Sequence, residues 1–376
     1  MPTEARPATT IEAVEVYGYQ LTYAHGRYVM SGGRVVTTLA STVVRVATAG
    51  GISGFGEVCP LGPTYLPGFA GGVRAAVAEL APALLGVDAA DLGAVDRTME
   101  GALAGHGYAK SALDVACWDV LGQVAGLPVA TLLGGCLTPS FPLYSAVPLG
   151  DPTQMVAYVV ARRSEGIHRF QLKVGGRPED DARRVEAIVE ATGGDDLLIA
   201  DANGGWRQRE ALVAARLLER LPRLMLEQPC PTLDECLAVR RSTTLPVVLD
   251  EVITDVAALL GAQRHGAMDA VNLKISRVGG LTRARLVRDL AATLGLGITV
   301  EDTWGGDLTT AAVAHLATST PTAALLNVSF MNDWTNEHVA GHQPRSEDGT
   351  GRAPTGPGLG VEVDLGSLGP PLLTAR

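Results

Sequence analysis

The chain has 376 residues, of which 47% are hydrophobic, and its formal net charge at pH 7 is −10. A barrel of about 250 residues fits within this length and leaves roughly a hundred residues for other structure. The acidic balance gives no sign of a nucleic-acid-binding surface. No apolar run in the sequence reaches the roughly 18 residues that a membrane span needs. We therefore expect a globular protein whose partner is a small molecule, with no nucleic acid or membrane partner.

Two further features indicate a cytoplasmic protein. Residues 1–10 contain proline and glutamate but no apolar stretch, so no signal peptide is expected. The cysteines are odd in number and lack the spacing of a zinc site. Reduced and mostly buried thiols are therefore expected at Cys59, Cys117, Cys136, Cys230 and Cys236.

The first third of the chain predicts a separate α+β domain. Alternating and β-branched residues indicate strands at 11–21, 35–48 and 52–58. Helical patterns follow at 71–85, 92–103 and 109–124. Because no helix separates the strands, we expect an antiparallel meander. On the third helix, Asp114 and Asp119 are expected to have structural roles.

Two loops of this domain are candidates for covering an active site. The loop 23–33 contains three glycines, and the loop 59–69 sets Thr64 and Tyr65 in a frame of proline and glycine. The second loop has two interpretations: it is a rigid surface turn, or it presents Thr64 and Tyr65 to a substrate. The sequence leaves both interpretations open.

Five short apolar runs between residues 170 and 274 each end in a charged residue. In chain order, these residues are Lys173, Asp201, Glu227, Asp250 and Lys274. They lie roughly 23 to 28 residues apart, which is the length of one strand, one helix and two loops in repeated βα units. Because active sites of α/β barrels lie at the C-terminal ends of the strands, we expect the five side chains to converge.

The order of these residues predicts chemistry. If the runs are consecutive strands of an eight-stranded ring, the two lysines lie four strands apart and face each other. The three carboxylates between them repel one another unless a cation lies among them. Hard oxygen ligands suit Mg²⁺. A single carboxylate at a strand end is more often a loop cap or an ion pair, but three in successive units argue against that interpretation.

The rest of the chain completes the count of strands. A first barrel strand is predicted near residues 141–145, followed by a helix at 152–165. A seventh strand is predicted at 297–302, with a helix that reaches Ser319, and an eighth strand at 323–330. The sequence therefore predicts eight strands with a helix after at least seven of them.

With these motifs, the chain resembles the enolase superfamily, in the muconate lactonizing enzyme subgroup. The matching motifs are Asp201-Ala202-Asn203, Glu227-Gln228-Pro229, Asp250-Glu251, Lys173 on the second strand, and Asn272-x-Lys274 with Gly279-Gly280. The resemblance covers nearly the whole chain. It implies an α/β fold, a modified (β/α)7β TIM barrel with an N-terminal α+β capping domain. The implied domains are 1–138 for the capping domain, 139–340 for the barrel and 341–376 for a C-terminal return onto the capping domain.

The resemblance also implies roles for the site residues. It makes Asp201, Glu227 and Asp250 the ligands of Mg²⁺, and Lys173 and Lys274 the acid–base pair. A homo-oligomer is implied by analogy. The chain departs from the subgroup at Gln171, where a lysine usually stands. This neutral residue argues against lactonisation, dipeptide epimerisation and acylamino-acid racemisation, but leaves the proton-transfer pair intact.

Four segments resemble members that act on proline derivatives: 105–110, 170–176, 227–230 and 302–307. Two activities follow from this resemblance. The favoured one is dehydration of cis-3-hydroxy-L-proline to 1-pyrroline-2-carboxylate. The alternative is 2-epimerisation of proline betaine or 4-hydroxyproline betaine, and a more distant alternative is another racemase or cycloisomerase.

Several residues are candidates for substrate contacts: Gln171, Asn203, Asp302, Trp304 and Tyr65. Trp304 either faces the substrate ring or its cationic nitrogen, or packs over the barrel mouth. Asp302 or Asp307 is a candidate partner of a substrate ammonium group, whereas Asp307 is also placed to cap a helix.

Two other classes of protein are less consistent with the sequence. A non-catalytic binding barrel would not need two opposed lysines beside a metal site. A class I aldolase would use a lysine that forms a Schiff base, but would not need three carboxylate ligands.

Overall fold

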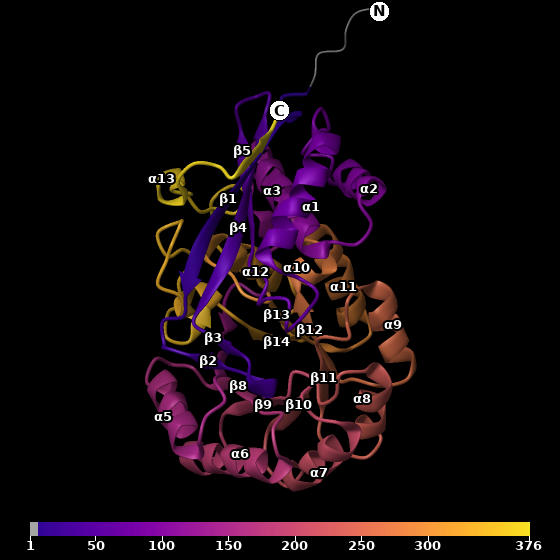
Figure 1. Ribbon diagram of the computed structural model, residues 1–376, viewed down its shortest axis with the longest axis vertical. Coiled ribbons are helices and arrows are strands. Elements are labelled where there is room, and N and C mark those ends of the chain that lie inside the picture. Colours follow the sequence, from indigo (N-terminus) through magenta and orange to yellow (C-terminus); the bar gives the residue numbers. More distant parts are fainter. Residues whose placement is uncertain (1–6) are drawn as a thin grey trace, which may run out of the picture.

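The computed structural model describes residues 7–376 (Figure 1). Residues 1–6 lie outside the described part, and with them most of the segment for which no signal peptide was expected. Among residues 7–376, no helix is both long enough and apolar enough to cross a membrane. All five cysteines are free thiols, and four of them are buried, as expected.

The capping domain contains a four-stranded antiparallel sheet in the order β16-β1-β4-β5. These strands are β1 (Ile11–Thr22), β4 (Thr38–Thr48), β5 (Ser53–Val58) and β16 (Leu373–Ala375). The first three form the expected meander. The strand predicted at 35–48 is broken, because β3 (Val35–Val36) leaves this sheet and pairs with β2 (Tyr28–Val29) around a short 3-10 turn at Ser31–Gly33.

Three helices cover this sheet: α1 (Ala70–Leu84) and α3 (Gly107–Ala125) pack on it, and α2 (Leu92–Ala102) packs on α1 and α3. Two glycines of β5 allow α3 to approach closely. A Cβ atom would lie 2.1 Å from the carbonyl oxygen of Ala116 if added at Gly54, and 2.1 Å from that of Ala112 if added at Gly56. A larger residue at either position would push the helix away from the sheet. The one-turn helix α4 (Val129–Leu132) then leads into the barrel.

The barrel consists of eight parallel strands whose spatial order follows the chain. They are β7 (Ser145–Val147), β8 (Arg169–Lys173), β9 (Leu197–Asp201), β10 (Leu224–Glu227), β11 (Val247–Leu249), β12 (Ala270–Lys274), β13 (Gly297–Glu301) and β14 (Leu325–Val328). The ring closes through a parallel bridge between Leu143 and Val328, where the amide of Tyr144 donates to the carbonyl of Val328 at 3.0 Å.

A helix follows each of the first seven strands. These helices are α5 (Pro152–Arg163), α6 (Pro178–Thr192), α7 (Gln208–Leu218), α8 (Leu233–Arg240), α9 (Val256–Arg264), α11 (Leu281–Thr293) and α12 (Asp307–Thr318). The one-turn helix α10 (Ile275–Val278) precedes α11, and β14 leads instead to the 3-10 turn η2 (Met331–Trp334). The fold is therefore the modified (β/α)7β barrel with an N-terminal capping domain that the sequence predicted.

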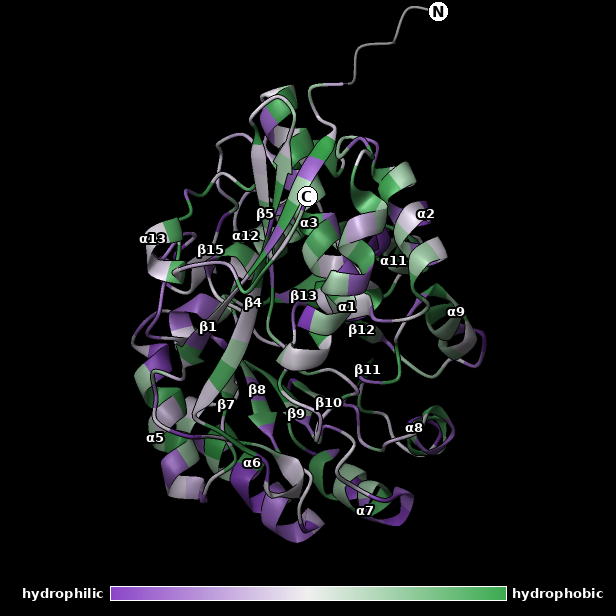
Figure 2. Ribbon diagram, turned by 45° about the horizontal axis from the view of Figure 1, so that its top comes forward, coloured by the Kyte–Doolittle hydropathy of each residue, from purple (hydrophilic) through white to green (hydrophobic). Residues whose placement is uncertain are grey.

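Packing and hydropathy match this arrangement. Hydrophilic residues gather on the outer helices α5, α6 and α7, whereas the strands inside carry mainly apolar residues (Figure 2). One continuous apolar core lies between strands and helices, and a small cluster that includes Ile199, Val248 and Ala270 fills the barrel interior. Polar residues at the strand ends are therefore the exception that needs an explanation.

The end of the chain returns to the capping domain. β15 (Thr350–Gly351) pairs with β6 (Phe141–Pro142), and α13 (Leu365–Leu368) precedes the final strand β16. β16 extends the capping sheet by pairing with β1. In Figure 1 the yellow C-terminal segment lies beside the indigo strands of the capping domain.

Candidate active site

The charged residues of the series lie at one edge of the barrel. Lys173, Asp201, Glu227 and Lys274 are the last residues of their strands, and Asp250 directly follows β11. Pairing in the sheet aligns Lys173 with Asp201 and Asp201 with Glu227. All five residues are at most 5% exposed. The structure therefore brings together the side chains that the sequence placed at strand ends.

Each lysine contacts one of the carboxylates. Lys173 Nζ donates to Asp201 Oδ2, and Lys274 Nζ donates to Asp250 Oδ2 at 2.6 Å. Burial lowers the pKa of Lys173, but the charge of Asp201 outweighs burial and holds the pKa well above its usual value. Burial would raise the pKa of Asp250, yet Lys274 and Arg277 hold it well below its usual range.

Glu227 has neutral donors instead. Gln171 Nε2 lies 3.1 and 3.0 Å from its two carboxylate oxygens, and Asn272 Nδ2 donates to Oε1 at 2.8 Å. Burial, and then the charges of Asp201 and Asp250, raise the pKa of Glu227 well above its usual value. The three carboxylates are therefore close enough to repel one another, and Gln171 lies against one of them.

The donor set fits a hard divalent cation, although the lysines contact two of its members. Within residues 7–376, no three acidic, histidine or cysteine side chains already stand in a metal-binding arrangement. The carboxylates nevertheless supply three buried, mutually repelling oxygen ligands of the kind that Mg²⁺ prefers. Beside them, Asn203 Oδ1, Glu251 Oε2 and Asn272 Oδ1 are buried oxygens that have no hydrogen-bond donor among the described residues.

Asn203, Glu251 and Tyr65 form a second layer around Asp201 and Asp250. Asn203 Nδ2 donates to Asp201 Oδ2 at 2.9 Å and to Glu251 Oε1 at 3.2 Å. The hydroxyl of Tyr65 donates to Glu251 Oε1 at 2.6 Å. Burial, and then the charges of Asp250 and Asp201, raise the pKa of Glu251 to about 7. Tyr65 of the capping domain therefore reaches the barrel mouth, whereas Thr64 is exposed.

A small pocket lies above these groups, and its empty space measures about 320 Å³. Both lysines line it, although they come from β8 and β12, four places apart in the ring. Both candidate loops contribute to its wall, through Tyr28 and Met30 from one loop and Leu61 and Tyr65 from the other. The other lining residues are Tyr144, Ala146, Gln171, Glu301, Asp302, Thr303, Trp304, Met331 and Trp334.

The position of Trp304 is consistent with both of its expected roles, packing over the barrel mouth and contact with the substrate. It lines the pocket, and its ring centroid lies 5.3 Å from that of Tyr28 and 5.8 Å from that of Trp334. It is 2% exposed, and its Nε1 has no acceptor among the described side chains and backbone. The indole therefore packs within an aromatic cluster and also faces the space where a substrate would bind.

The structure changes the interpretation of two aspartates. Asp302 lines the pocket, but its carboxylate accepts from the hydroxyl and the amide of Ser276 and, at 2.6 Å, from the amide of Thr303. Burial raises the pKa of this carboxyl group to about 6. Asp302 therefore supports the turn after β12.

Asp307 is not among the residues that line the pocket. The residue that caps α12 is Gly306, so the interpretation of Asp307 as a helix cap is wrong. Its carboxylate instead accepts from the amide of Ala340 at 2.8 Å and from Asn332 Nδ2 at 3.0 Å. It therefore holds the loop after η2 against α12, and the alternative role as partner of a substrate ammonium group finds no support in its position.

Several residues of the pocket were not predicted from the sequence. Glu301 ends β13 as Lys274 ends β12, and the two are paired in the sheet, so its position at a strand end was a usable signal. Tyr144 precedes the first barrel strand, whereas Tyr28 lies in the two-residue strand β2 and Trp334 in the 3-10 turn η2, elements too short to show a periodic pattern. Arg277 follows Lys274 by one helical turn and donates to Asp250 Oδ1 at 2.7 Å. The loop residues could not be identified from spacing.

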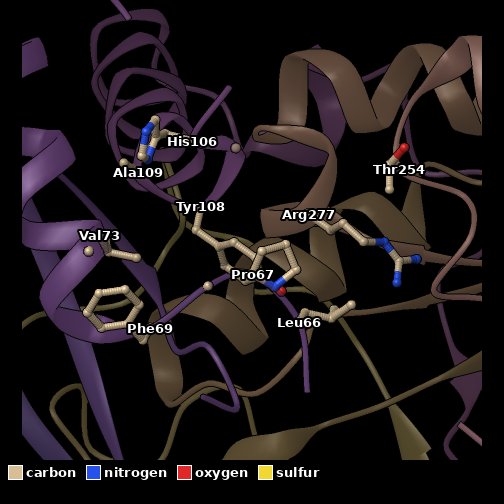
Figure 3. Close-up of a pocket in the computed structure, with 12 residues that line it drawn as sticks. Leu66, Pro67, Phe69, Val73, His106, Tyr108, Ala109, Thr254 and Arg277 are labelled. Carbon is tan, nitrogen blue, oxygen red and sulfur yellow. The ribbon is translucent and has the colours of Figure 1, made fainter. Parts of the chain in front are cut away.

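A larger cavity lies between the capping domain and the barrel (Figure 3), with about 980 Å³ of empty space. Leu66, Pro67, Phe69 and Tyr108 are among the residues that line it. Arg277 also lines it, but its guanidinium is bound to Asp250 and to the carbonyl of Asn272. This cavity is mainly apolar and lacks the lysines, so we take the smaller pocket as the candidate active site.

The use of basic residues supports this assignment. The chain has 30 lysines and arginines, and only three of these are lysines: Lys110, Lys173 and Lys274. Arginine remains protonated in proteins and cannot serve as a base. Two of the three lysines therefore line the smaller pocket, and the third pairs with Glu100 in the capping domain at 2.5 Å.

Comparisons with known proteins agree with this geometry. Residues 21–134 match the family described as mandelate racemase/muconate lactonizing enzyme, N-terminal domain, and residues 154–367 match enolase C-terminal domain-like proteins. The chain is 43% identical to cis-3-hydroxy-L-proline dehydratase of Roseibium aggregatum, over 96% of this chain and 98% of that protein. It is 30% identical to chloromuconate cycloisomerase of Pseudomonas putida, over 85% and 88% of the two chains.

Solved structures show the same fold. A mandelate racemase/muconate lactonizing enzyme from Roseovarius nubinhibens ISM, complexed with magnesium, superposes with a TM-score of 0.94. The two chains are 35% identical, over 98% of this chain and 100% of the other. The muconate lactonizing enzyme from Pseudomonas fluorescens, complexed with muconolactone, superposes with a TM-score of 0.90 at 26% identity, over 95% and 97% of the two chains.

Proposed function

Because the chain belongs to the mandelate racemase/muconate lactonizing enzyme family of the enolase superfamily, we propose that it dehydrates cis-3-hydroxy-L-proline to 1-pyrroline-2-carboxylate. The observation that carries the proposal is a pair of lysines, Lys173 and Lys274, that line one pocket from opposite sides of the barrel. The relative from Roseibium aggregatum supports the choice of substrate.

The stereochemistry of this substrate suits two opposed lysines. In cis-3-hydroxy-L-proline, the hydroxyl and the carboxylate lie on the same face of the ring. The α-proton and the hydroxyl therefore lie on opposite faces. Their elimination needs a base on one face and an acid on the other, and strands four places apart in an eight-stranded ring supply groups in that relation.

The elimination balances without an oxidant or reductant. One lysine removes the α-proton in its neutral form, which requires that its contact with Asp201 or Asp250 be broken first. The electron pair of the C–H bond forms a double bond to the β-carbon. The bond between the β-carbon and oxygen breaks, and the oxygen leaves with its electron pair and takes a proton from the opposite lysine as water. The remaining cyclic enamine tautomerises to 1-pyrroline-2-carboxylate.

We also propose that Asp201, Glu227 and Asp250 hold Mg²⁺ near the substrate carboxylate. When bound, the cation would offset the repulsion among the three carboxylates and stabilise negative charge on the substrate as the α-proton leaves. The raised pKa of Glu227 and the oxygen donor set support this proposal. Gln171 and Asn203 are positioning residues in this arrangement, because they donate to Glu227 and Asp201.

The domains divide this work between them. We assign the chemistry to the barrel, residues 139–340, and closure of the pocket to the capping domain, residues 1–138, through Tyr65. Residues 341–376 secure the capping domain. The free thiols suit a reducing cytoplasm, and we expect a homo-oligomer by analogy with the family.

Epimerisation of proline betaine or 4-hydroxyproline betaine is the second candidate function. The same two lysines could remove the α-proton from one face and return a proton to the other. The aromatic wall formed by Tyr28, Trp304 and Trp334 favours it, because aromatic faces attract quaternary ammonium groups.

Proton NMR in D₂O with Mg²⁺ separates the two functions. We expect loss of cis-3-hydroxy-L-proline and appearance of 1-pyrroline-2-carboxylate. In the trans isomer, the α-proton and the hydroxyl lie on the same face of the ring. This isomer should react at least about 100-fold more slowly, because the lysine that acts as the acid is on the face opposite its hydroxyl. Exchange of the α-proton of proline betaine without dehydration of either 3-hydroxyproline would replace the dehydratase proposal by the epimerase.

A further inference from the structure

Two acidic residues beyond the proposed metal ligands line the pocket, and they differ in the use of their oxygens. Asp302 accepts from three donors of the adjacent turn. Glu301 has two neighbours, the hydroxyl of Tyr144, which donates to Oε2, and Lys274 Nζ, which lies 3.3 Å from Oε1. Among the described residues, no backbone amide donates to Glu301. Glu301 lines the pocket, and its oxygens retain capacity to accept hydrogen bonds.

The position of Glu301 in the ring complements that of the metal ligands. Glu301 ends β13, which lies four strands from β9 and its Asp201. A cyclic amino acid whose carboxylate lies near the arc of β9 to β11 would direct its other polar groups toward the opposite arc. Glu301 is 2% exposed, so its charge is little screened by water, and among the described residues Lys274 is the cation that lies beside it, at Oε1.

Aromatic rings enclose this side of the pocket. The ring of Tyr144 lies 6.0 Å from that of Trp334, which in turn lies 5.8 Å from that of Trp304. A buried carboxylate beside aromatic rings forms a receptor for an organic cation, because the rings attract positive charge and the carboxylate accepts N–H donors. Trp304 Nε1, which has no acceptor among the described residues, is a further donor for a substrate oxygen.

We propose that Glu301 binds the cationic ring nitrogen of the substrate and selects nitrogens that carry N–H donors over quaternary ones. The inference rests on the proposed proton abstraction at this site and adds the group that recognises the nitrogen. A free ring ammonium donates two N–H groups to the carboxylate. The two N-methyl groups of a betaine donate no hydrogen bond, and they keep the positive charge of the nitrogen farther from the carboxylate. Glu301 therefore favours the free imino acid.

Binding measurements test this role independently of turnover. L-proline and tetrahydrofuran-2-carboxylate have similar shapes, but the second has an oxygen in place of the ring nitrogen. We would measure both dissociation constants by titration calorimetry with Mg²⁺, for the unaltered protein and for Glu301→Gln. We expect tighter binding of L-proline by the unaltered protein and a loss of about 100-fold in the variant, with less than about a threefold change for the oxygen analogue.

Two variants control for general damage to the site. Glu301→Asp keeps the charge and should recover part of the lost affinity for L-proline. Glu190→Gln makes the same chemical change at an exposed position of α6 and should leave both constants unaltered. At saturating cis-3-hydroxy-L-proline, Glu301→Gln should keep kcat within about tenfold while KM rises, because the residue recognises the nitrogen and takes no part in proton transfer.

Other outcomes would overturn the inference. Equal losses of affinity for both ligands would assign Glu301 to holding Lys274 or Tyr144. An unchanged constant for L-proline would remove any role in recognition, as would equal binding of both ligands by the unaltered protein. If Glu301→Gln loses L-proline selectively while the unaltered protein dehydrates neither 3-hydroxyproline, the recognition role stands and only the proposed reaction fails.

Discussion

Three buried carboxylates at the seam between the domains and the three proposed metal ligands at the barrel mouth have different kinds of partner. At the seam, Glu57 accepts from Ser41 Oγ at 2.7 Å and from the amide of Gly306 at 3.0 Å. Asp114 accepts from the amide of Thr282 at 3.0 Å, and Asp119 from that of Leu359, in the C-terminal return, at 2.8 Å. These donors are neutral backbone and hydroxyl groups, as expected for structural acids.

At the mouth, the partners are cations and other carboxylates. Asp201 and Asp250 contact lysines, and the charges of both act on Glu227. The pKa values reflect the difference. Burial raises the pKa of Asp114 to about 7 and that of Asp119 to about 6, whereas Lys274 and Arg277 overcome burial and lower that of Asp250. Burial alone therefore does not identify a reactive acid; the charge of its partners does.

The lysines provide the largest test of this difference. We expect Lys173→Ala and Lys274→Ala each to reduce dehydration by about 10²- to 10⁴-fold, the range of a lost acid or base. Lys110→Ala removes the third lysine, which is buried in the capping domain. It should lower the melting temperature but keep kcat, as measured by thermal unfolding and by NMR turnover. A comparable loss of kcat in all three variants would remove the distinction between the two regions.

Removal of metal should affect the mouth and spare the seam. We expect treatment with a chelator to abolish dehydration and added Mg²⁺ to restore it, because Asp201, Glu227 and Asp250 then lose and regain the cation that offsets their repulsion. Glu227→Gln should weaken Mg²⁺ binding, measured by calorimetry. Full activity in the presence of excess chelator would contradict the assignment of these carboxylates as metal ligands.

The opposite pattern is expected at the seam. Glu57→Ala leaves several buried donors unpaired, among them Ser41 and the amide of Gly306. The free energy of unfolding should fall by about 3 kcal/mol, because each unpaired buried donor costs roughly 1–3 kcal/mol. Denaturant titration measures this loss, and Glu190→Gln is the exposed control. An unchanged stability would show that these hydrogen bonds are replaced by water.

The smallest effect concerns pH. Burial raises the pKa of Asp114 to about 7, above the roughly 3.9 of an unfolded chain. The folded state therefore binds this proton more tightly, and the resulting stabilisation is present below about pH 4 and is lost as the pH rises toward 7. Asp114→Asn cannot titrate, so its stability relative to the unaltered protein should increase over this window, by at most about 1.4 kcal/mol per pH unit.

Chemical denaturation at several pH values measures this difference. Asp119 titrates in both proteins, so its contribution cancels in the comparison. A constant difference between pH 4 and pH 7 would show that Asp114 is not protonated in the folded state in this window.

The barrel could be predicted from the sequence because the pattern of its βα units is local and periodic. Each run from Lys173 to Lys274 ends at the same edge, since parallel strands with intervening helices place every C-terminal end on one side. The lysines and carboxylates could therefore be located by counting. The break at Thr37, between β3 and β4, could not be predicted from the sequence, because the segments on both sides carry β-branched residues.

The wall of the pocket was harder to predict because it is formed by contacts distant in sequence. Tyr65 lies 185 residues from Asp250, and no spacing links the two. Asp302 and Glu301 are neighbours at a strand end, yet one accepts from the backbone and the other faces the pocket. Side chains alternate along a strand, so sequence can assign neighbouring residues to opposite faces. Which of the two carboxylates accepts hydrogen bonds from the adjacent turn depends on the path of the backbone there, and sequence patterns do not specify that path.

The central claim is that Lys173 and Lys274 act on opposite faces of one α-carbon. We would measure exchange of the α-proton of L-proline and of D-proline with D₂O by NMR, in Lys173→Ala and in Lys274→Ala with Mg²⁺. If the lysines are opposed, each variant should lose exchange with a different enantiomer and keep it with the other. If both variants lose the same enantiomer and keep the other, the lysines serve one face, and the account is contradicted.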